Sequence, residues 1–502
     1  MLISEELGIL CKDEYKNFNI DIFMGQLKSY RFYIITFLFT ATELFAQSSF
    51  ERAAISHISP KRMQTAVRDL VSFGNRVGGS PSGDQSAFYV AKQFKGYGYR
   101  PQIIKGPELL AYINISWILA VDTPRSLSGL IQHEWIAGFS PKTPLRKSQL
   151  VFQSANEIPE KQRIDGKVVL IDSHISYSSY IELAKSGAVC VLSYEPNAAI
   201  KQGATITSLP RRDDNPIPLF NISSANGFRL RRELEKGRKI TIKYSVDTKI
   251  KKGLPKTVTA TLRGEKDEYY IVCAHGDSDS GGPGADDNAS GVAGVLELSR
   301  IMQKLVHSSS AKKPKYSIKF IVWGAERYST EHYIEMNKKN LAKIKGVINF
   351  DEIGIGKSRN CLYFEGNDVP HNSELLHQLC AVGEEFADKK GFWNEATSTP
   401  SLGGTDSNNF LPDGLKRLGI PIIEIPAITV FTAAWNMPEV LAQTPNWKSK
   451  AWKGHPDSVV IDYSPYYHSS IDIPALTTDK EPANMVWAVK AVAITLIRIL
   501  WN

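Results

Sequence analysis

The chain has 502 residues, of which 42% are hydrophobic, 10% aromatic and 22% charged. These proportions are ordinary for a globular protein, and the length allows about two or three domains with a sizeable core. The formal net charge is +8, but basic runs such as residues 229–239 lack interleaved aromatic side chains, so we expect no nucleic-acid partner.

Residues 24–46 have the composition of an export signal. Lys28 and Arg31 form a basic start, an apolar run follows, and Ala46 ends a plausible cleavage site. The apolar run is too short to span a bilayer comfortably. We therefore expect a start at Met24 and an exported, periplasmic or extracellular protein with no stable membrane association after cleavage. An uncleaved membrane anchor is the alternative, and we expect no other segment to span a membrane.

Two segments with different patterns follow. Residues 60–118 begin with apolar side chains at helical spacing and continue through a Gly- and Ser-rich loop into a second amphipathic helix. Residues 119–242 then alternate strand-like and helix-like runs, for example at 166–173 and 180–196. No cluster of His and acidic residues follows these strands, so we expect residues 119–242 to form a separate domain without catalytic residues.

From residue 243 onward, strand-like and helical runs alternate. The predicted order is strands at 257–264 and 269–274, helix 291–306, strand 317–323, helix 331–343, strand 346–351, helix 372–386, strand 420–425 and a final helix at 480–500. Strands that alternate with helices indicate βαβ units. The sequence therefore predicts an α/β fold with a mostly parallel mixed sheet flanked by helices.

The loop after the strand-like run 269–274 carries His275, Asp277 and Asp287 on a Gly-rich turn. Imidazole and carboxylate are ligands that suit zinc, and the ends of strands in an open α/β sheet are where ligand sites form. For this segment alone, a polar loop that caps the following helix through Asp287 or Asn288 is the alternative.

Three later residues occupy similar positions. Glu326 and Asp351 each follow a strand-like run, and His468 lies in an aromatic loop at residues 462–472. A lone His or Asp is usually an ordinary surface or core residue. His275, Glu326 and Asp351 each follow a strand-like run. Three independent placements of this kind are harder to obtain by chance, so the sequence predicts one metal site built from these segments.

The order and spacing of these motifs resemble the zinc exopeptidases of clan MH, peptidase family M28, which includes aminopeptidases and the glutamate-carboxypeptidase type. Matching motifs are HGD at 275–277, DNASG at 287–291, NFD at 349–351 and YYHSSID at 466–472. The motif GAER at 324–327 departs from the family, because Arg327 stands where the family has the second Glu of a pair.

The resemblance implies a set of zinc ligands. His275, Asp287 and Asp351 correspond to the first zinc site, and Asp287 also corresponds to the carboxylate that bridges two metals. His468 corresponds to a ligand of the second zinc. We therefore expect one or two zinc ions as cofactor and a peptide as substrate.

The resemblance also implies roles for three carboxylates. Glu326 matches the general base, which takes a proton from a zinc-bound water whose pKa falls to about 7. Asp277 matches the carboxylate that orients the ring of His275. Asp406 lies in the loop 403–407, which resembles a substrate-side loop of the family, and a turn-stabilising role is the alternative for it.

Arg327 changes the expected second metal site. Arginine offers no lone pair to a metal, and a charge of +1 about 4 Å from a +2 ion is repelled by roughly 8 kcal/mol at an effective dielectric of about 20. Three outcomes are open. Arg327 turns away or else the second zinc binds weakly or not at all, Glu331 supplies the missing carboxylate from the next helical turn, or Arg327 replaces the second metal and binds a substrate carboxylate or the oxyanion.

We therefore predict an exported zinc-dependent exopeptidase, either an aminopeptidase or a dipeptidase-like carboxypeptidase. Its peptidase domain would comprise residues 60–118 and 243–502, and residues 119–242 resemble a protease-associated domain that covers the active-site cleft. A catalytically degenerate homologue that binds peptides or proteins is the alternative that Arg327 favours. Acyl transfer of the glutaminyl-cyclase kind is less favoured, because by resemblance it uses the Glu that this chain lacks. The oligomeric state is not predicted.

Overall fold

The computed structural model describes residues 49–501 except 130, 132–133, 155–160, 199, 279–281, 309–312, 357–359, 367–369, 401–403 and 435–461. By its internal contacts the chain divides into two units, Met1–Arg52 and Ala53–Asn502. The predicted export segment at residues 24–46 lies outside the described residues, and the fold given below is that of the second unit.

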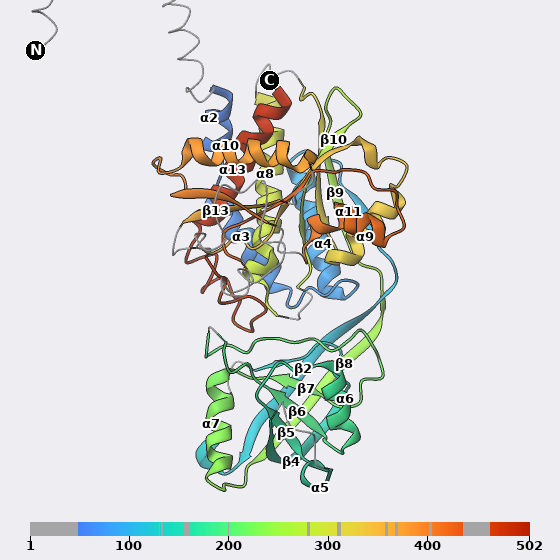
Figure 1. Ribbon diagram of the computed structural model, residues 1–502, viewed down its shortest axis with the longest axis vertical. Helices are drawn as coiled ribbons and strands as arrows, with labels where there is room; N and C mark the ends of the chain where they lie inside the picture. The colour runs from blue at the N-terminus through green and yellow to red at the C-terminus, as the bar shows by residue number, and fades with distance from the viewer. Residues whose placement is uncertain are drawn as a thin grey trace, which may run out of the picture. The chain divides into compact units, whose positions relative to one another are not determined.

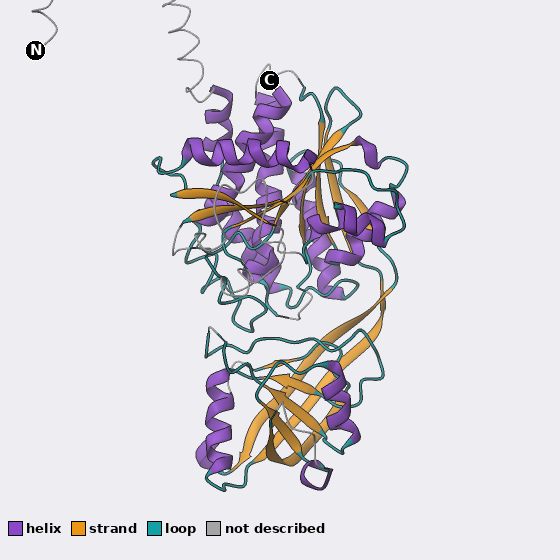
Figure 2. Cartoon of the chain, viewed as in Figure 1, coloured by secondary structure: helices purple, strands orange, loops and turns teal. Residues whose placement is uncertain are grey.

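An eight-stranded mixed sheet forms the larger part of the second unit (Figures 1 and 2). Its strands in spatial order are β1 (Gln102–Lys105), β9 (Lys256–Leu262), β11 (Ser317–Trp323), β10 (Tyr269–His275), β12 (Ile344–Phe350), β15 (Ala427–Phe431), β13 (Cys361–Gly366) and β14 (Glu395–Pro400). The central strands β11, β10, β12 and β15 run parallel, and antiparallel pairs flank them. The predicted α/β fold with a mostly parallel mixed sheet is confirmed.

Helices flank this sheet (Figure 1). They are α3 (Pro60–Ser72), α4 (Pro81–Gly96), α8 (Gly291–Ser308), α9 (Glu326–Met336), α10 (Pro370–Phe386), α11 (Pro412–Arg417) and α13 (Ala483–Trp501). Because helices cover both faces, the central strand β10 is buried at every position, and its sequence is a continuous apolar run without alternation. Helix α3 begins after Ser59, whose side chain accepts a hydrogen bond from the backbone N–H of Arg62.

Helix α13 is long and apolar enough to cross a membrane by length and composition. This finding differs from the expectation that no segment beyond the export signal has this character. Because 67% of its most apolar window is buried inside the fold, α13 has the burial of a core helix. Its close contacts with α8 and α10 explain the apolar composition.

Two predicted boundaries were wrong. The strand predicted at residues 420–425 lies instead at β15, because Pro421 within that run and Pro426 directly after it lack the N–H that a central strand needs. Helix α9 begins at Glu326, five residues before the predicted helix at 331–343. The second difference places Glu326 and Arg327 on a helix, which determines where their side chains point.

A seven-stranded second sheet is built from the segment between the two parts of the first. Its strands in spatial order are β2 (Leu109–Thr123), β8 (Thr241–Gly253), β4 (Thr143–Gln153), β5 (Val168–Ile171), β6 (Cys190–Ser193), β7 (Leu219–Asn221) and β3 (Trp135–Ile136). Helices α5 (Lys161–Ile164), α6 (Tyr177–Lys185) and α7 (Ser224–Glu235) accompany it. The sheet has a hydrophobic core of its own, which includes Leu150, Leu170 and Phe220.

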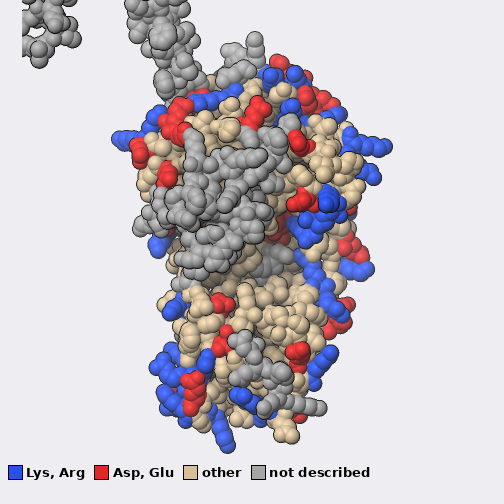
Figure 3. Space-filling model, viewed as in Figure 1, with Lys and Arg blue, Asp and Glu red and all other residues tan. Residues whose placement is uncertain are grey.

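The long antiparallel ribbon of β2 and β8 carries the chain into and out of the second sheet (Figure 1). It extends beyond both ends of the predicted segment 119–242. On the face shown in Figure 3, Lys and Arg side chains are interspersed with Asp and Glu.

Candidate metal centre

Neighbouring parallel strands end at one edge of the first sheet and bring the predicted site residues together. His275 is the last residue of β10, and it pairs in register with Trp323 at the end of β11. Glu326 follows β11 as the first residue of α9, and Asp351 follows β12 directly. Because β11, β10 and β12 are adjacent, these three side chains converge at the carboxyl end of the sheet.

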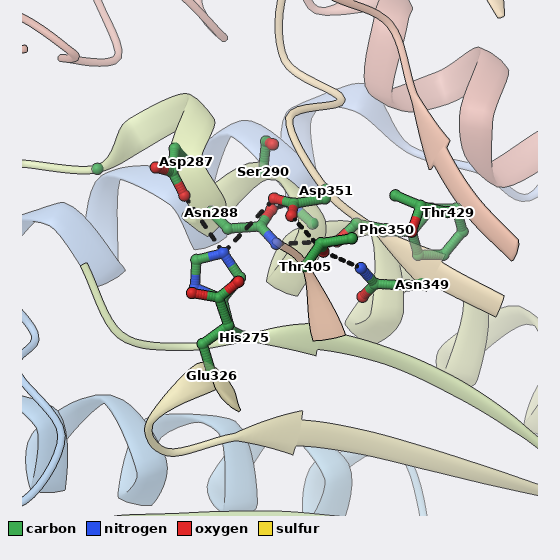
Figure 4. Close-up of polar contacts among 12 residues, drawn as sticks. His275, Asp287, Asn288, Ser290, Glu326, Asn349, Phe350, Asp351, Thr405 and Thr429 are labelled. Carbon is green, nitrogen blue, oxygen red and sulfur yellow. Dashed lines mark hydrogen bonds and ion pairs between the residues drawn. The ribbon is translucent and has the colours of Figure 1, made fainter. Parts of the chain in front are cut away.

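His275, Asp287 and Asp351 form a buried cluster whose ligand atoms all lie within 4.8 Å of one another. The Nε2 atom of His275 lies 3.2 Å from Oδ1 of Asp287 and 3.5 Å from Oδ1 of Asp351. Figure 4 shows the three side chains turned toward one another, with Glu326 beside the imidazole. One imidazole and two carboxylates at this spacing suit a zinc ion.

The other oxygen of Asp287 faces the second predicted histidine. Its Oδ2 atom lies 3.1 Å from Nε2 of His468, whose ring stacks on Tyr467 with centroids 3.8 Å apart. The backbone of His468 has a φ of 47°, which is uncommon for a residue other than glycine. Asp287 therefore stands between two histidines, which is the arrangement that a carboxylate bridging two metal ions requires.

Buried groups from distant segments hold the Asp287 loop. The carboxylate of Asp472 accepts hydrogen bonds from the backbone N–H groups of Asp286, at 2.8 Å, and Asp287, at 3.1 Å. The buried guanidinium of Arg76 donates to the carbonyls of Gly276, Pro283 and Gly284 at 2.8 to 3.0 Å. These contacts fix the position of the loop that carries Asp287.

Gly291, at the start of α8, has no room for a side chain. A Cβ atom there would meet the carbonyl oxygen of Phe350 at 2.4 Å. The close approach lets the Asn288 amide donate to the same carbonyl at 2.9 Å. Helix α8 is thereby fastened to the end of β12, next to Asp351.

Asp277 contacts both His275 and Glu326. One of its carboxylate oxygens accepts the backbone N–H of Glu326 at 3.0 Å and lies 3.5 Å from Nδ1 of His275. The carbonyl of Asp277 also lies 3.1 Å from the same ring nitrogen. Asp277 can therefore set the orientation of the imidazole and the start of α9 together.

Burial raises the pKa of the Glu326 carboxyl well above its usual range. The nearby His275 opposes this shift, and the charge of Asp406 adds to it. A carboxyl group with a raised pKa can exchange a proton near neutral pH, as a general base must.

Thr405 orients Asp351 and was not identified from the sequence. Its hydroxyl donates to Oδ2 of Asp351 at 2.7 Å and accepts from the side-chain amide of Asn349 at 2.7 Å. The neighbouring Asp406 is fully buried, and neither of its carboxylate oxygens has a hydrogen-bond partner among the described residues. Burial raises the pKa of Asp406 well above its usual range. The loop at 403–407 had been singled out, but a hydroxyl gives no motif signal of its own.

Arg327 points away from the cluster. Its side chain is 60% exposed and pairs with Glu331 one helical turn later, with Nε and Oε1 2.8 Å apart. Arg417 also pairs with the same carboxylate oxygen of Glu331 at 3.3 Å. Of the three outcomes open at the sequence level, this geometry corresponds to the first, in which Arg327 turns away.

A cavity of about 440 Å³ opens over the cluster. Its lining residues are His174, Ile206, Thr207, Ser208, His275, Asp287, Glu326, Asp351, Glu352, Gly404, Thr405, Tyr467 and His468. Four of these belong to the segment that contains the second sheet, so that segment forms part of the cavity wall. The sequence pointed to neither these four nor Glu352, because they carry no ligand motif.

The described residues at this site fit a divalent cation. The carboxylates of the cluster and its surroundings outnumber the histidines and Arg76, so the site carries excess negative charge. Both oxygens of Asp406 are buried without a hydrogen-bond partner among the described residues. An uncompensated buried charge is costly, and a bound cation relieves it.

Comparison with known families supports a hydrolytic role. Residues 257–493 match the model of Peptidase family M28, and this range runs from β9 into α13 and contains the whole cluster. Leucine aminopeptidase 2 of Arthroderma otae is 24% identical over 405 residues, covering 75% of this chain and 74% of the relative. The Probable lipoprotein aminopeptidase LpqL of Mycobacterium tuberculosis is 26% identical over 440 residues, covering 84% and 79%.

Solved structures share the fold. A Peptidase M28 precursor from Shewanella amazonensis superimposes with a TM-score of 0.64 at 17% identity, covering 90% of this chain and 96% of that one. A zinc aminopeptidase from Bacillus subtilis has a TM-score of 0.56 at 17% identity, covering 89% and 96%. At these identities the likeness is one of fold.

Proposed function

We propose that this protein is a zinc-dependent aminopeptidase that removes the first residue of peptides with a free amino terminus, a proposal that the match of residues 257–493 to the model of Peptidase family M28 supports. The observation that carries the proposal is the buried cluster of His275, Asp287 and Asp351 at the floor of a cavity. The aminopeptidase names of the curated relatives favour the amino-terminal over the carboxyl-terminal direction of attack.

We assign the first zinc to His275, Asp287 and Asp351, and a second to Asp287 and His468. When bound, zinc lowers the pKa of a coordinated water and polarises the scissile carbonyl. Arg327 adds no ligand to the second site, so that site has one protein carboxylate fewer than the family pattern. We expect the second ion to bind more weakly than the first.

The chain's own residues supply the proton transfers. Glu326 accepts the proton of the attacking water and delivers it to the leaving amine. Asp277 holds Glu326 through its backbone N–H, and it holds His275 through the ring nitrogen that faces away from the metal. The fixed positions of both groups reduce the reorganisation that proton transfer would otherwise require.

We propose two further assignments. Residues 119–242 form a protease-associated domain, supported by the separate second sheet and its own core. This domain narrows the cavity through Ile206, Thr207 and Ser208, which restricts substrates to chain ends that fit between the two sheets. The protein is exported, as the composition of residues 24–46 suggests.

Elemental analysis and a pair of substrates test the proposed function. The protein beginning at Gln47 should bind at least one zinc per chain and hydrolyse leucyl-p-nitroanilide, but not its N-acetylated counterpart. Removal of zinc with a chelator should abolish hydrolysis, and added zinc should restore it. His275→Ala should lose both zinc and activity.

Other outcomes would redirect the assignment. Zinc binding without hydrolysis of any free-amine substrate would favour the degenerate, peptide-binding homologue to which Arg327 points. Cleavage of N-acetylated dipeptides would indicate a carboxypeptidase.

A further inference from the structure

Glu352 is a carboxylate of the cavity that the proposed chemistry leaves unused. It follows Asp351 directly, and its backbone φ of 48° turns the chain sharply after the metal ligand. The carbonyl of Glu352 accepts the backbone N–H of Thr432 at 3.1 Å, which holds this turn in place. The residue is 1% exposed and lines the same cavity as Glu326 and His468.

In the part of the chain that the structure describes, the carboxylate of Glu352 is buried without a hydrogen-bond partner. Neither of its oxygens accepts a hydrogen bond within the described part of the chain. Of the other acidic residues of the cavity, Asp287 faces two histidines, Asp351 accepts from Thr405, and Glu326 is assigned to proton transfer above. Burying a carboxylate without a partner costs free energy of folding. A cation that binds beside the carboxylate offsets this cost.

Glu352 is not one of the ligands of the first metal site. Among the described residues, the ligand atoms that lie within 4.8 Å of one another belong to His275, Asp287 and Asp351, and Glu352 is not one of this group. A cation that Glu352 meets in the cavity therefore stands outside this cluster.

The first residue of a peptide can carry two cations, the α-ammonium group and the side-chain cation of lysine or arginine, and these lie at different distances from the scissile bond. The α-ammonium is attached to the carbon next to the scissile carbonyl, so it must lie beside the metal cluster and Glu326. The side-chain cation of lysine or arginine is several bonds farther away. A carboxylate in the cavity but outside the metal cluster is placed for the more distant of the two.

We propose that Glu352 binds the side-chain cation of the substrate's first residue and directs the enzyme to peptides that begin with lysine or arginine. This inference rests on the aminopeptidase function proposed above. Ile206 and Tyr467 in the same cavity offer apolar surface for the aliphatic stem of such a side chain. A cavity of about 440 Å³ is of the size that holds small ligands.

Four aminoacyl-methylcoumarylamides test the proposal, with lysine, arginine, norleucine and leucine as the first residue. Norleucine has nearly the shape of lysine without its charge. The wild-type protein should prefer lysine and arginine, and Glu352→Gln should lower kcat/KM for these two by roughly 10- to 100-fold, the range for a lost charge-assisted hydrogen bond. Values for norleucine and leucine should change by less than about 3-fold, because the metal and Glu326 are untouched.

Two measurements that do not depend on turnover accompany the kinetics. Zinc content should be the same in wild type and Glu352→Gln. Calorimetric titration of the zinc-loaded protein should show that lysinamide binds more tightly than norleucinamide, and that Glu352→Gln removes the difference. Glu335→Gln, which makes the same charge change at an exposed site on α9, is the matched control and should behave as wild type.

Three results would overturn the inference. An equal loss for all four substrates would assign Glu352 to the α-ammonium, a loss of zinc would make it a metal ligand, and no preference of the wild type for lysine over norleucine would remove its basis. Failure of the proposed function looks different. In that case no substrate would be hydrolysed, while lysinamide binding that depends on Glu352 would persist.

Discussion

Asp287 presents each of its carboxylate oxygens to a different histidine, Oδ1 to His275 and Oδ2 to His468. This arrangement depends on Asp472, whose carboxylate accepts a hydrogen bond from the backbone N–H of Asp287. Two histidines that share one carboxylate leave little freedom for either ring. At the scale of single residues, these contacts hold the site residues in position, which lowers the cost of ordering them around a metal.

Glu326→Gln should separate catalysis from metal binding. The variant keeps the size of the side chain but cannot accept a proton, so kcat should fall by about 10² to 10⁴, the usual contribution of a general base. Zinc content should stay at the wild-type value, because Glu326 is not one of the three clustered ligands. Steady-state kinetics with elemental analysis checks both. An unchanged kcat would remove Glu326 from its role, and a loss of zinc would make it a ligand.

At the scale of elements, a short segment from the second-sheet region pairs with the loop that carries His468. The N–H of Ile206 donates to the carbonyl of His468 at 2.7 Å, and the N–H of Ser470 donates to the carbonyl of Ala204 at 2.9 Å. A Cβ on Gly203 would meet Ile471 at 2.5 Å, so the two segments are in close contact. The segment thus holds the left-handed backbone of His468 in place.

Ile206→Pro should loosen that hold, because proline has no N–H to donate. One backbone hydrogen bond contributes about 0.5–1.5 kcal/mol, so we expect affinity for the second zinc to fall by roughly 2- to 10-fold. The first zinc and the circular dichroism spectrum should be unchanged. Zinc titration by calorimetry measures the two affinities, and Ile206→Val, which keeps the N–H, is the control. If Ile206→Pro and Ile206→Val bind zinc alike, the pairing does not position His468.

At the scale of the whole molecule, buried tyrosines make the stability of the fold depend on pH in alkaline solution. Burial raises the pKa of Tyr99 and of Tyr333 well above their ordinary values, and it raises that of Tyr270 to about 12. Tyr99 donates its hydroxyl to the carbonyl of Ser299 at 2.8 Å and packs on Phe320. The folded protein therefore keeps these hydroxyls neutral where an unfolded chain would lose the protons.

The free energy of unfolding should fall as pH rises above about 10. The unfolded tyrosines ionise at about pH 10 while the folded ones stay protonated, so each group destabilises the fold by up to about 1.4 kcal/mol per pH unit until its folded pKa is reached. Urea unfolding at pH 9, 10 and 11 measures the slope. Tyr99→Phe removes one such group and should show a shallower decline between pH 10 and 11, and identical declines would contradict the argument.

Much of the fold and of the candidate site could be predicted from local pattern. The continuous apolar run of β10 indicates a buried parallel strand, and polar residues directly after β10, β11 and β12 mark one edge of the sheet. The prediction of a strand at residues 420–425 failed because the run is apolar but contains a proline, which has no N–H to donate. The sequence analysis also missed that α13 is long and apolar enough for a membrane span, a composition that buried packing in a core equally requires.

The sequence by itself determined the order of the elements and the candidate ligands, because strand periodicity and loop chemistry act over a few neighbouring residues. The tertiary fold alone determines that Arg327 turns toward Glu331, that Thr405 orients Asp351, that residues 203–208 reach the His468 loop, and that Glu352 has no hydrogen-bond partner among the described residues. Each of these depends on contacts, or on their absence, between residues that folding brings together from distant parts of the chain.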